Sequence, residues 1–199
     1  KYGYIGGVRS TAMMISYEIP LVLSIVGVLI VTGSLSMVSI VEAQSVPLIL
    51  LQPLAFIIFV IAASAEIGRS PFDLLEADSE IVAGFHTEYS GMKYGLFMFA
   101  EWTHAFAVSC ILTTLFLSGW KGPGLPAAIW FLGKVMVVFF ALVWVRSTLP
   151  RLRIDQLMEF AWKFLFPLAL ANIFITGIEM IIWPAFPWWL MFLNIPIAG

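Results

Sequence analysis

Acidic side chains gather in one short segment of this chain and are rare elsewhere. The segment 66–93 lies between two long apolar stretches. It holds six of the twelve Asp and Glu residues: Glu66, Asp73, Glu76, Asp78, Glu80 and Glu88. Carboxylates this dense beside apolar segments must face water, a partner protein or a path for protons. Which of these they face decides what the protein does.

Three carboxylates fall within apolar stretches or at their ends, where ionised groups are costly. Glu18 lies just before Pro20, Glu66 ends the second stretch, and Glu101 lies three residues before His104. Burial can bring the pKa of a carboxyl group close to neutral, so such groups can carry protons. We expect these three carboxylates to form a proton relay, with a purely structural role as the alternative.

Two further charges in apolar stretches are open to either interpretation. Lys134 lies near the middle of one stretch and Glu179 toward the end of another. A long side chain can reach the membrane surface, or make a structural hydrogen bond, without any part in function. The residue type and position alone do not decide between a structural and a functional role for these two residues.

The composition predicts an all-α integral membrane protein. Of the 199 residues, 61% are hydrophobic and 11% are charged, whereas soluble domains have about 45–50% apolar and about 25% charged residues. The net charge of −2 is too small to indicate a nucleic-acid partner. A single cysteine, Cys110, excludes a disulfide framework and cannot hold an iron–sulfur cluster. Any redox centre is therefore expected on another subunit.

Five apolar stretches have roughly the length of a membrane span, which takes about 20 residues. They cover residues 11–31, 46–65, 94–118, 125–145 and 164–183. We interpret the chain, 1–199, as a single membrane domain with three segments outside the spans. These are an acidic loop with short helices at 66–93, a basic loop at 146–163 and a proline-containing interfacial tail at 184–199.

Positive charges predict the orientation of these spans. Eight Lys and Arg residues fall on the side that carries both loops, and only Lys121 falls on the opposite side. Cytoplasmic loops of membrane proteins carry an excess of Lys and Arg. The acidic and basic loops should therefore both be cytoplasmic, where they could pair.

Three separated stretches of this chain form distinctive motifs. The first is AEIGRSPFDLLEADSEIVAGFHTEYSGMKYGLFMFAEW at 65–102. The others are RSTAMMISYEIPL at 9–21 and RSTLPRLRIDQLMEFAWKFLFPLALAN at 146–172. Together they resemble the family of membrane subunits that form the quinone site of respiratory complex I. The chain departs from the family pattern at Gly68, where Asn is usual, at Leu75, where Pro is usual, and at Asp78, often Glu or Gly. These changes bear on the loop conformation rather than on the function.

The resemblance implies a protein with eight spans, of which this chain would contain the last five. It implies proton-translocating NADH:quinone oxidoreductase activity in a complex, with no catalytic residue on this chain. The residues that match the family's proton relay are Glu18, Glu66, Glu76, Asp78, Glu80, Glu88 and Glu101. Those that match its quinone cavity are Arg69, Phe72, Asp73 and Arg146. A structural ion pair with Asp73 or Glu66 is the alternative role for Arg69.

The resemblance also implies partners and a location. Quinone would be the substrate, with FMN and iron–sulfur clusters on partner subunits. The partners would be peripheral iron–sulfur and quinone-site subunits, together with antiporter-like and small membrane subunits. The location would be the bacterial plasma membrane, or the mitochondrial inner membrane. The alternatives are the matching subunit of a membrane-bound hydrogenase or of a ferredoxin-dependent quinone reductase, and a transporter or scaffold without a redox partner.

Overall fold

The computed structural model describes residues 2–44, 46–68, 72, 91–124, 126–148 and 153–182. Every regular element in these ranges is a helix. The elements are α1 (Tyr2–Thr32), α2 (Met37–Ala43), α3 (Leu48–Leu51), α4 (Pro53–Glu66), α5 (Met92–Phe116), α6 (Ala127–Thr148), α7 (Ile154–Glu159), the π-helical segment η2 (Phe160–Leu165) and α8 (Phe166–Ile182).

Four helical segments of the described chain are long and apolar enough to cross a membrane. They are Gly7–Thr32, Met92–Phe116, Ala127–Val145 and Ile154–Ile182, and the apolar helix Pro53–Glu66 is shorter. The expectation of an all-helical membrane protein is therefore confirmed. The interfacial tail at 184–199 lies outside the described residues.

The second apolar stretch is broken, although the sequence suggested one span over 46–65. The short helix α3 ends before Gln52, and α4 begins at Pro53. Proline has no backbone N–H, so the carbonyl of Ile49 loses its partner four residues later. Gln52 bridges the break, because its own N–H donates to the carbonyl of Leu48 and its carbonyl accepts from Phe56.

The last helix begins earlier than expected. Residues 154–163 were expected to lie in a basic loop, but they form α7 and part of η2, continuous with α8. Asp155 in the first turn favours a helix start there. Pro167 accounts for the wide π-helical turns, because it cannot donate a hydrogen bond and its ring crowds the carbonyl of Lys163. Arg146 likewise belongs to α6 rather than to a loop.

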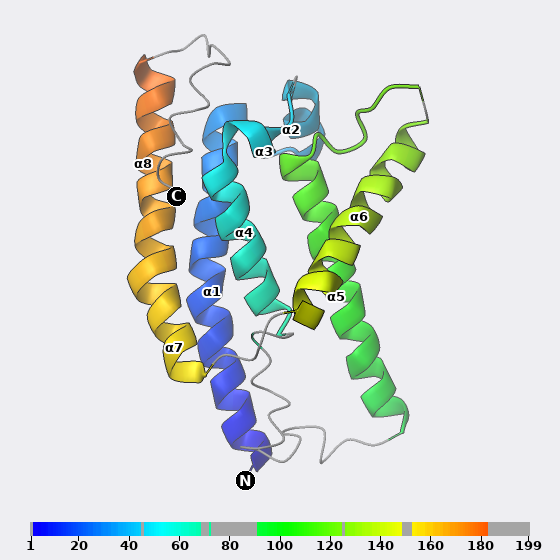
Figure 1. The fold of residues 1–199 in the computed structure, drawn as a ribbon, viewed down its shortest axis with the longest axis vertical. Coiled ribbons are helices and arrows are strands. Elements are labelled where there is room, and N and C mark those ends of the chain that lie inside the picture. Colours follow the sequence, from blue (N-terminus) through cyan, green and yellow to red (C-terminus); the bar gives the residue numbers. More distant parts are fainter. Residues whose placement is uncertain are drawn as a thin grey trace.

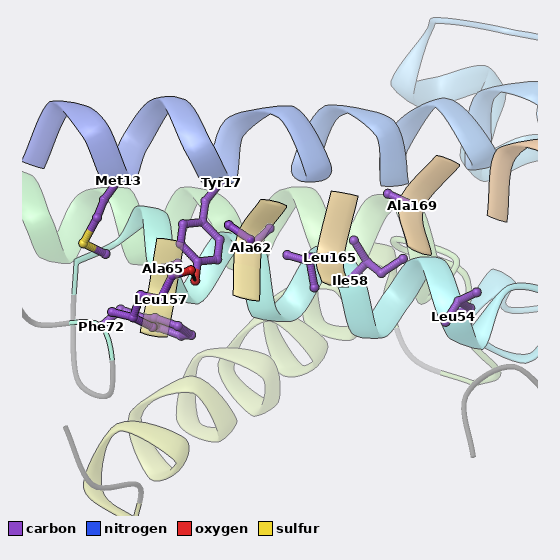
Figure 2. Close-up of a cluster of buried hydrophobic side chains, with 11 residues drawn as sticks. Met13, Tyr17, Leu54, Ile58, Ala62, Ala65, Phe72, Leu157, Leu165 and Ala169 are labelled. Atoms are coloured by element: carbon purple, nitrogen blue, oxygen red, sulfur yellow. Dashed lines mark hydrogen bonds between the residues drawn. The ribbon is translucent and has the colours of Figure 1, made fainter. Parts of the chain in front are cut away.

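The helices pack in two groups that meet at α4. Helix α1 lies between α8 and α4, and α5 packs against α6 (Figure 1). One buried core joins α1, α4 and the α7–α8 helix (Figure 2), and a second joins α1, α4 and α5. Helix α6 leaves much of its apolar surface exposed, with Val137 and Phe140 about two-thirds accessible. Such a surface suits contact with lipid or with another membrane protein.

The helix bundle has two distinct ends, a cavity end and a lysine end. The cavity end carries the last residue of α4, Glu66, and the first of α5, Met92. The lysine end carries the last residue of α5, Phe116, and the first of α6, Ala127. In Figure 1 the cavity end lies at the bottom and the lysine end at the top.

Candidate functional site

A cavity of about 290 Å³ opens at the cavity end, where α1, the end of α4 and α5 come together. Its lining mixes apolar side chains with two carboxylates and an imidazole. The lining residues are Ser10, Met13, Met14, Ala65, Glu66, Ile67, Gly68, Phe72, Ala100, Glu101 and His104. The cavity therefore combines a surface for an apolar ring with groups that exchange protons.

The titratable groups of the cavity come from two helices. Glu66 is the last residue of α4, while Glu101 and His104 are three residues apart on α5 and so share a face. The Oε1 atom of Glu66 lies 4.0 Å from Nε2 of His104. Both side chains are partly exposed, so the pair contributes little to stability, about 1 kcal/mol at most. A small movement or one water molecule would let a proton pass between the two groups.

The apolar wall of the cavity is fixed by the first core. Phe72 is buried and meets the ring of Tyr17 edge to face, with centroids 5.6 Å apart. Figure 2 shows Met13, Tyr17 and Phe72 gathered beside Ala65. The hydroxyl of Tyr17 donates a hydrogen bond of 3.0 Å to the carbonyl of Leu157. This wall is therefore held to both α1 and α7, which gives the cavity a defined shape.

The structure brings together three residues that the sequence predicted for the site. Glu66, Glu101 and Phe72 all line the cavity, with His104 beside them. Glu18, expected in the same relay, is exposed on α1 and does not line the cavity. Six predicted site residues lie outside the described part of the chain: Arg69, Asp73, Glu76, Asp78, Glu80 and Glu88. The side chain of Arg146 also lies outside it.

Sequence reasoning missed the part of the cavity that α1 supplies. Ser10, Met13 and Met14 line it at spacings of three and four residues. That periodicity is the signal that could have marked this face of α1. Within the described residues, no group of three or more His, Cys, Asp or Glu side chains could hold a metal ion.

Lys134, left open by the sequence, has a structural role at the lysine end. Its ammonium group donates to the carbonyl oxygens of Leu117, Gly119 and Lys121, at 2.7, 3.1 and 2.7 Å. These bonds use all three donors of the ammonium. Lys121 in turn donates to the carbonyls of Glu42 and Gln44, both at 2.8 Å. Lys134 thus ties α6 to the end of α5 and the loop that follows it, and Lys121 ties that loop to the end of α2.

Known proteins match the chain over most of its length. The family model described as NADH dehydrogenase matches residues 1–177. A protein of Dehalococcoides mccartyi strain 195, named as the H subunit of NADH-quinone oxidoreductase, is 61% identical over 184 residues, which are 92% of this chain and 52% of the relative. Proteins of the same name from Geobacillus sp. strain WCH70 and Bacillus cytotoxicus are 55% and 52% identical, over 89% of this chain and 55% of each relative.

The chain spans about half the length of these curated relatives. The family model covers all three motifs on which the resemblance was based. That resemblance is therefore confirmed, and the chain belongs to the NADH dehydrogenase family of membrane subunits.

Proposed function

We propose that the chain is part of the quinone-site membrane subunit of a proton-translocating NADH:quinone oxidoreductase. The cavity at the cavity end would form part of the quinone chamber. The relatives are named as subunits of NADH-quinone oxidoreductase, and the four long apolar helices suit an integral membrane protein. The partners would be the iron–sulfur and quinone-site subunits on the cytoplasmic side and the antiporter-like subunits in the membrane.

The mixed lining of the cavity is the observation that carries this proposal. A quinone has an apolar ring and two carbonyl oxygens, and it takes up two electrons and two protons when it becomes a quinol. Met13 and Phe72 supply apolar surface for a ring, which is typical of small-molecule sites. Glu66, Glu101 and His104 lie on the same cavity and can give or accept protons. FMN and iron–sulfur clusters on partner subunits would supply the electrons.

Electric charge would couple quinone reduction to proton translocation. A negative charge near a carboxylate favours its protonated form. An electron arriving on quinone would therefore make Glu66 and Glu101 take up protons, and the loss of that charge would release them. The acidic segment that follows α4, with Glu76, Asp78, Glu80 and Glu88, would extend this response, as would Glu18. Arg69, Asp73 and Arg146 would balance the carboxylate charge around the cavity.

Replacement of Glu101 tests the proposal. In the assembled complex, Glu101→Ala should lower quinone reduction and proton pumping by about tenfold or more, because a positioned proton carrier is lost. Glu42→Ala is the matched control, since Glu42 is exposed and lies at the lysine end. It should leave both rates unchanged.

Two outcomes would contradict the proposal. Normal quinone reduction and pumping by a fully assembled Glu101→Ala complex would remove the relay role of this residue. Hydrogen evolution by the wild-type complex, without quinone reduction, would instead assign the chain to a membrane-bound hydrogenase.

A further inference from the structure

Buried amide groups converge where three helices meet, far from the cavity. Gln52, at the break between α3 and α4, is 2% exposed, and Asn172 of α8 is fully buried. A Cβ atom added to Gly27 of α1 would lie 2.9 Å from Nδ2 of Asn172 and 3.3 Å from Oε1 of Gln52. Both amides therefore point at the bare backbone of Gly27.

The side-chain nitrogen of Gln52 has hydrogen-bond partners within the chain. Nε2 of Gln52 donates to the carbonyl of Gly27 at 3.3 Å and to the hydroxyl of Thr176 at 3.1 Å. The Thr176 hydroxyl donates to the carbonyl of Asn172 at 2.8 Å. Because the Gly27 carbonyl can only accept, these bonds fix which end of the Gln52 amide is the nitrogen.

The remaining polar atoms of the two amides have no partner among the described residues. Oε1 of Gln52 and both polar atoms of the Asn172 side chain are buried and make no hydrogen bond there. A polar group buried without a partner costs free energy, and apolar surroundings within a membrane domain offer nothing to offset that cost. Three such atoms on two facing side chains indicate that something else satisfies them.

The mixture of donors and acceptors identifies the chemistry of that partner. It must donate to Oε1 of Gln52 and, whichever way the Asn172 amide is turned, both accept from its nitrogen and donate to its oxygen. A metal cation accepts no hydrogen bond, and a simple anion donates none. A water molecule does both and typically makes about two to four hydrogen bonds when buried.

We propose that Gln52 and Asn172 hold an internal water molecule between α1, α4 and α8, beside Gly27. The site fits the presence of a glycine here, since a Cβ atom at position 27 would lie 2.9 Å from Nδ2 of Asn172 and crowd the amides that hold the water. It also supplies a partner for the side-chain oxygen of Gln52, which lies buried beside a helix break in an apolar bundle. Ordered water is one of the means by which broken membrane helices satisfy their polar groups.

A polar stripe on α8 leads from this site toward the lysine end. Asn172, Thr176 and Glu179 follow one another at spacings of four and three residues, so they share one face of the helix. The Oε1 atom of Glu179 is also buried and has no hydrogen-bond partner among the described residues. The stripe therefore gives the site polar neighbours on its lysine-end side.

The test is a density map of the assembled complex at a resolution that shows ordered water. The wild-type chain should show density within hydrogen-bond distance of Gln52 Oε1 and of the Asn172 amide. Gly27→Ala should abolish this density, because its methyl group would crowd both amides. Gly177→Ala is the matched control, since a Cβ added to that helical glycine meets nothing within 4 Å, and it should keep the density.

Two results would overturn the proposal. One is a direct contact between the Gln52 and Asn172 amides with no density between them, and the other is density that persists unchanged in Gly27→Ala. Should Gly27→Ala fail to assemble, Asn172→Leu provides the second variant, because it removes two of the three unpaired atoms and should also remove the density. Quinone reduction is not the readout, so failure of the water site and failure of the proposed function are distinguishable.

Discussion

The two ends of the bundle treat charge in opposite ways. At the lysine end, the ammonium of Lys134 makes three hydrogen bonds to backbone carbonyls of its own chain. At the cavity end, Glu66 lies 4.0 Å from His104, both partly exposed on an open cavity. A charge that the fold fully satisfies serves stability, whereas one left beside a cavity is available for chemistry.

Position within an apolar segment therefore does not by itself mark a functional charge. Lys134 lies within a helix that can cross a membrane, yet its partners are the carbonyls of the loop that precedes that helix. These carbonyls follow the C-terminus of α5, where partial negative charge accumulates. Helix α5 thus places Glu101 on the cavity near one end, and at its other end the carbonyl of Leu117 accepts a hydrogen bond from Lys134.

The largest effect should follow from removal of the lysine. Lys134→Met leaves the carbonyls of Leu117, Gly119 and Lys121 without their donor, which should cost about 2 kcal/mol or more of stability. The amount of assembled complex and the midpoint of its thermal unfolding would both fall. Quinone reduction per assembled complex should stay unchanged. If Lys134→Met kept normal stability but slowed quinone reduction, the lysine end would have a functional rather than a structural role.

A smaller effect, on activity alone, should follow at the cavity end. Glu66→Gln and His104→Gln should each slow quinone reduction in the assembled complex. Because the two groups would pass the same proton, the double variant should be little slower than the slower single variant. The contribution of the pair to stability should not exceed about 1 kcal/mol, since both side chains are partly exposed. Thermal unfolding should be nearly unchanged, and additive losses in rate would contradict a shared proton path.

The sequence was sufficient for the helical membrane fold, because long apolar stretches leave few alternatives in lipid. It was less informative about helix boundaries. The Gln52–Pro53 pair was visible, but an apolar run on both sides suggested one continuous span. The early start of the last helix was missed because Arg151, Arg153 and Lys163 gave residues 146–163 the character of a basic loop.

The candidate site was only partly predictable for a similar reason. Glu101 and His104 share a helix, so their spacing alone placed them on one face. The spacing of Met13 from Ser10 could mark a face of α1, but only the packing of α1 against α4 and α5 makes that face a cavity wall. The role of Lys134 depends on a loop that folds back over the end of α5. Contacts between helices, rather than residue types, show which charged side chains hold the fold together and which line the cavity.

The smallest effect should follow from Lys163, a lysine with a close but exposed charged partner. Lys163 lies 2.6 Å from the carboxylate of Glu159, one turn away on the same helix, and both side chains are largely exposed. Water screens such a pair, so Lys163→Met should leave the thermal unfolding midpoint nearly unchanged. The thermal unfolding midpoints of the Lys163→Met and Lys134→Met complexes, measured together, compare the two substitutions directly. If Lys163→Met proved the more destabilising, ion pairing rather than carbonyl satisfaction would determine how lysines stabilise this bundle.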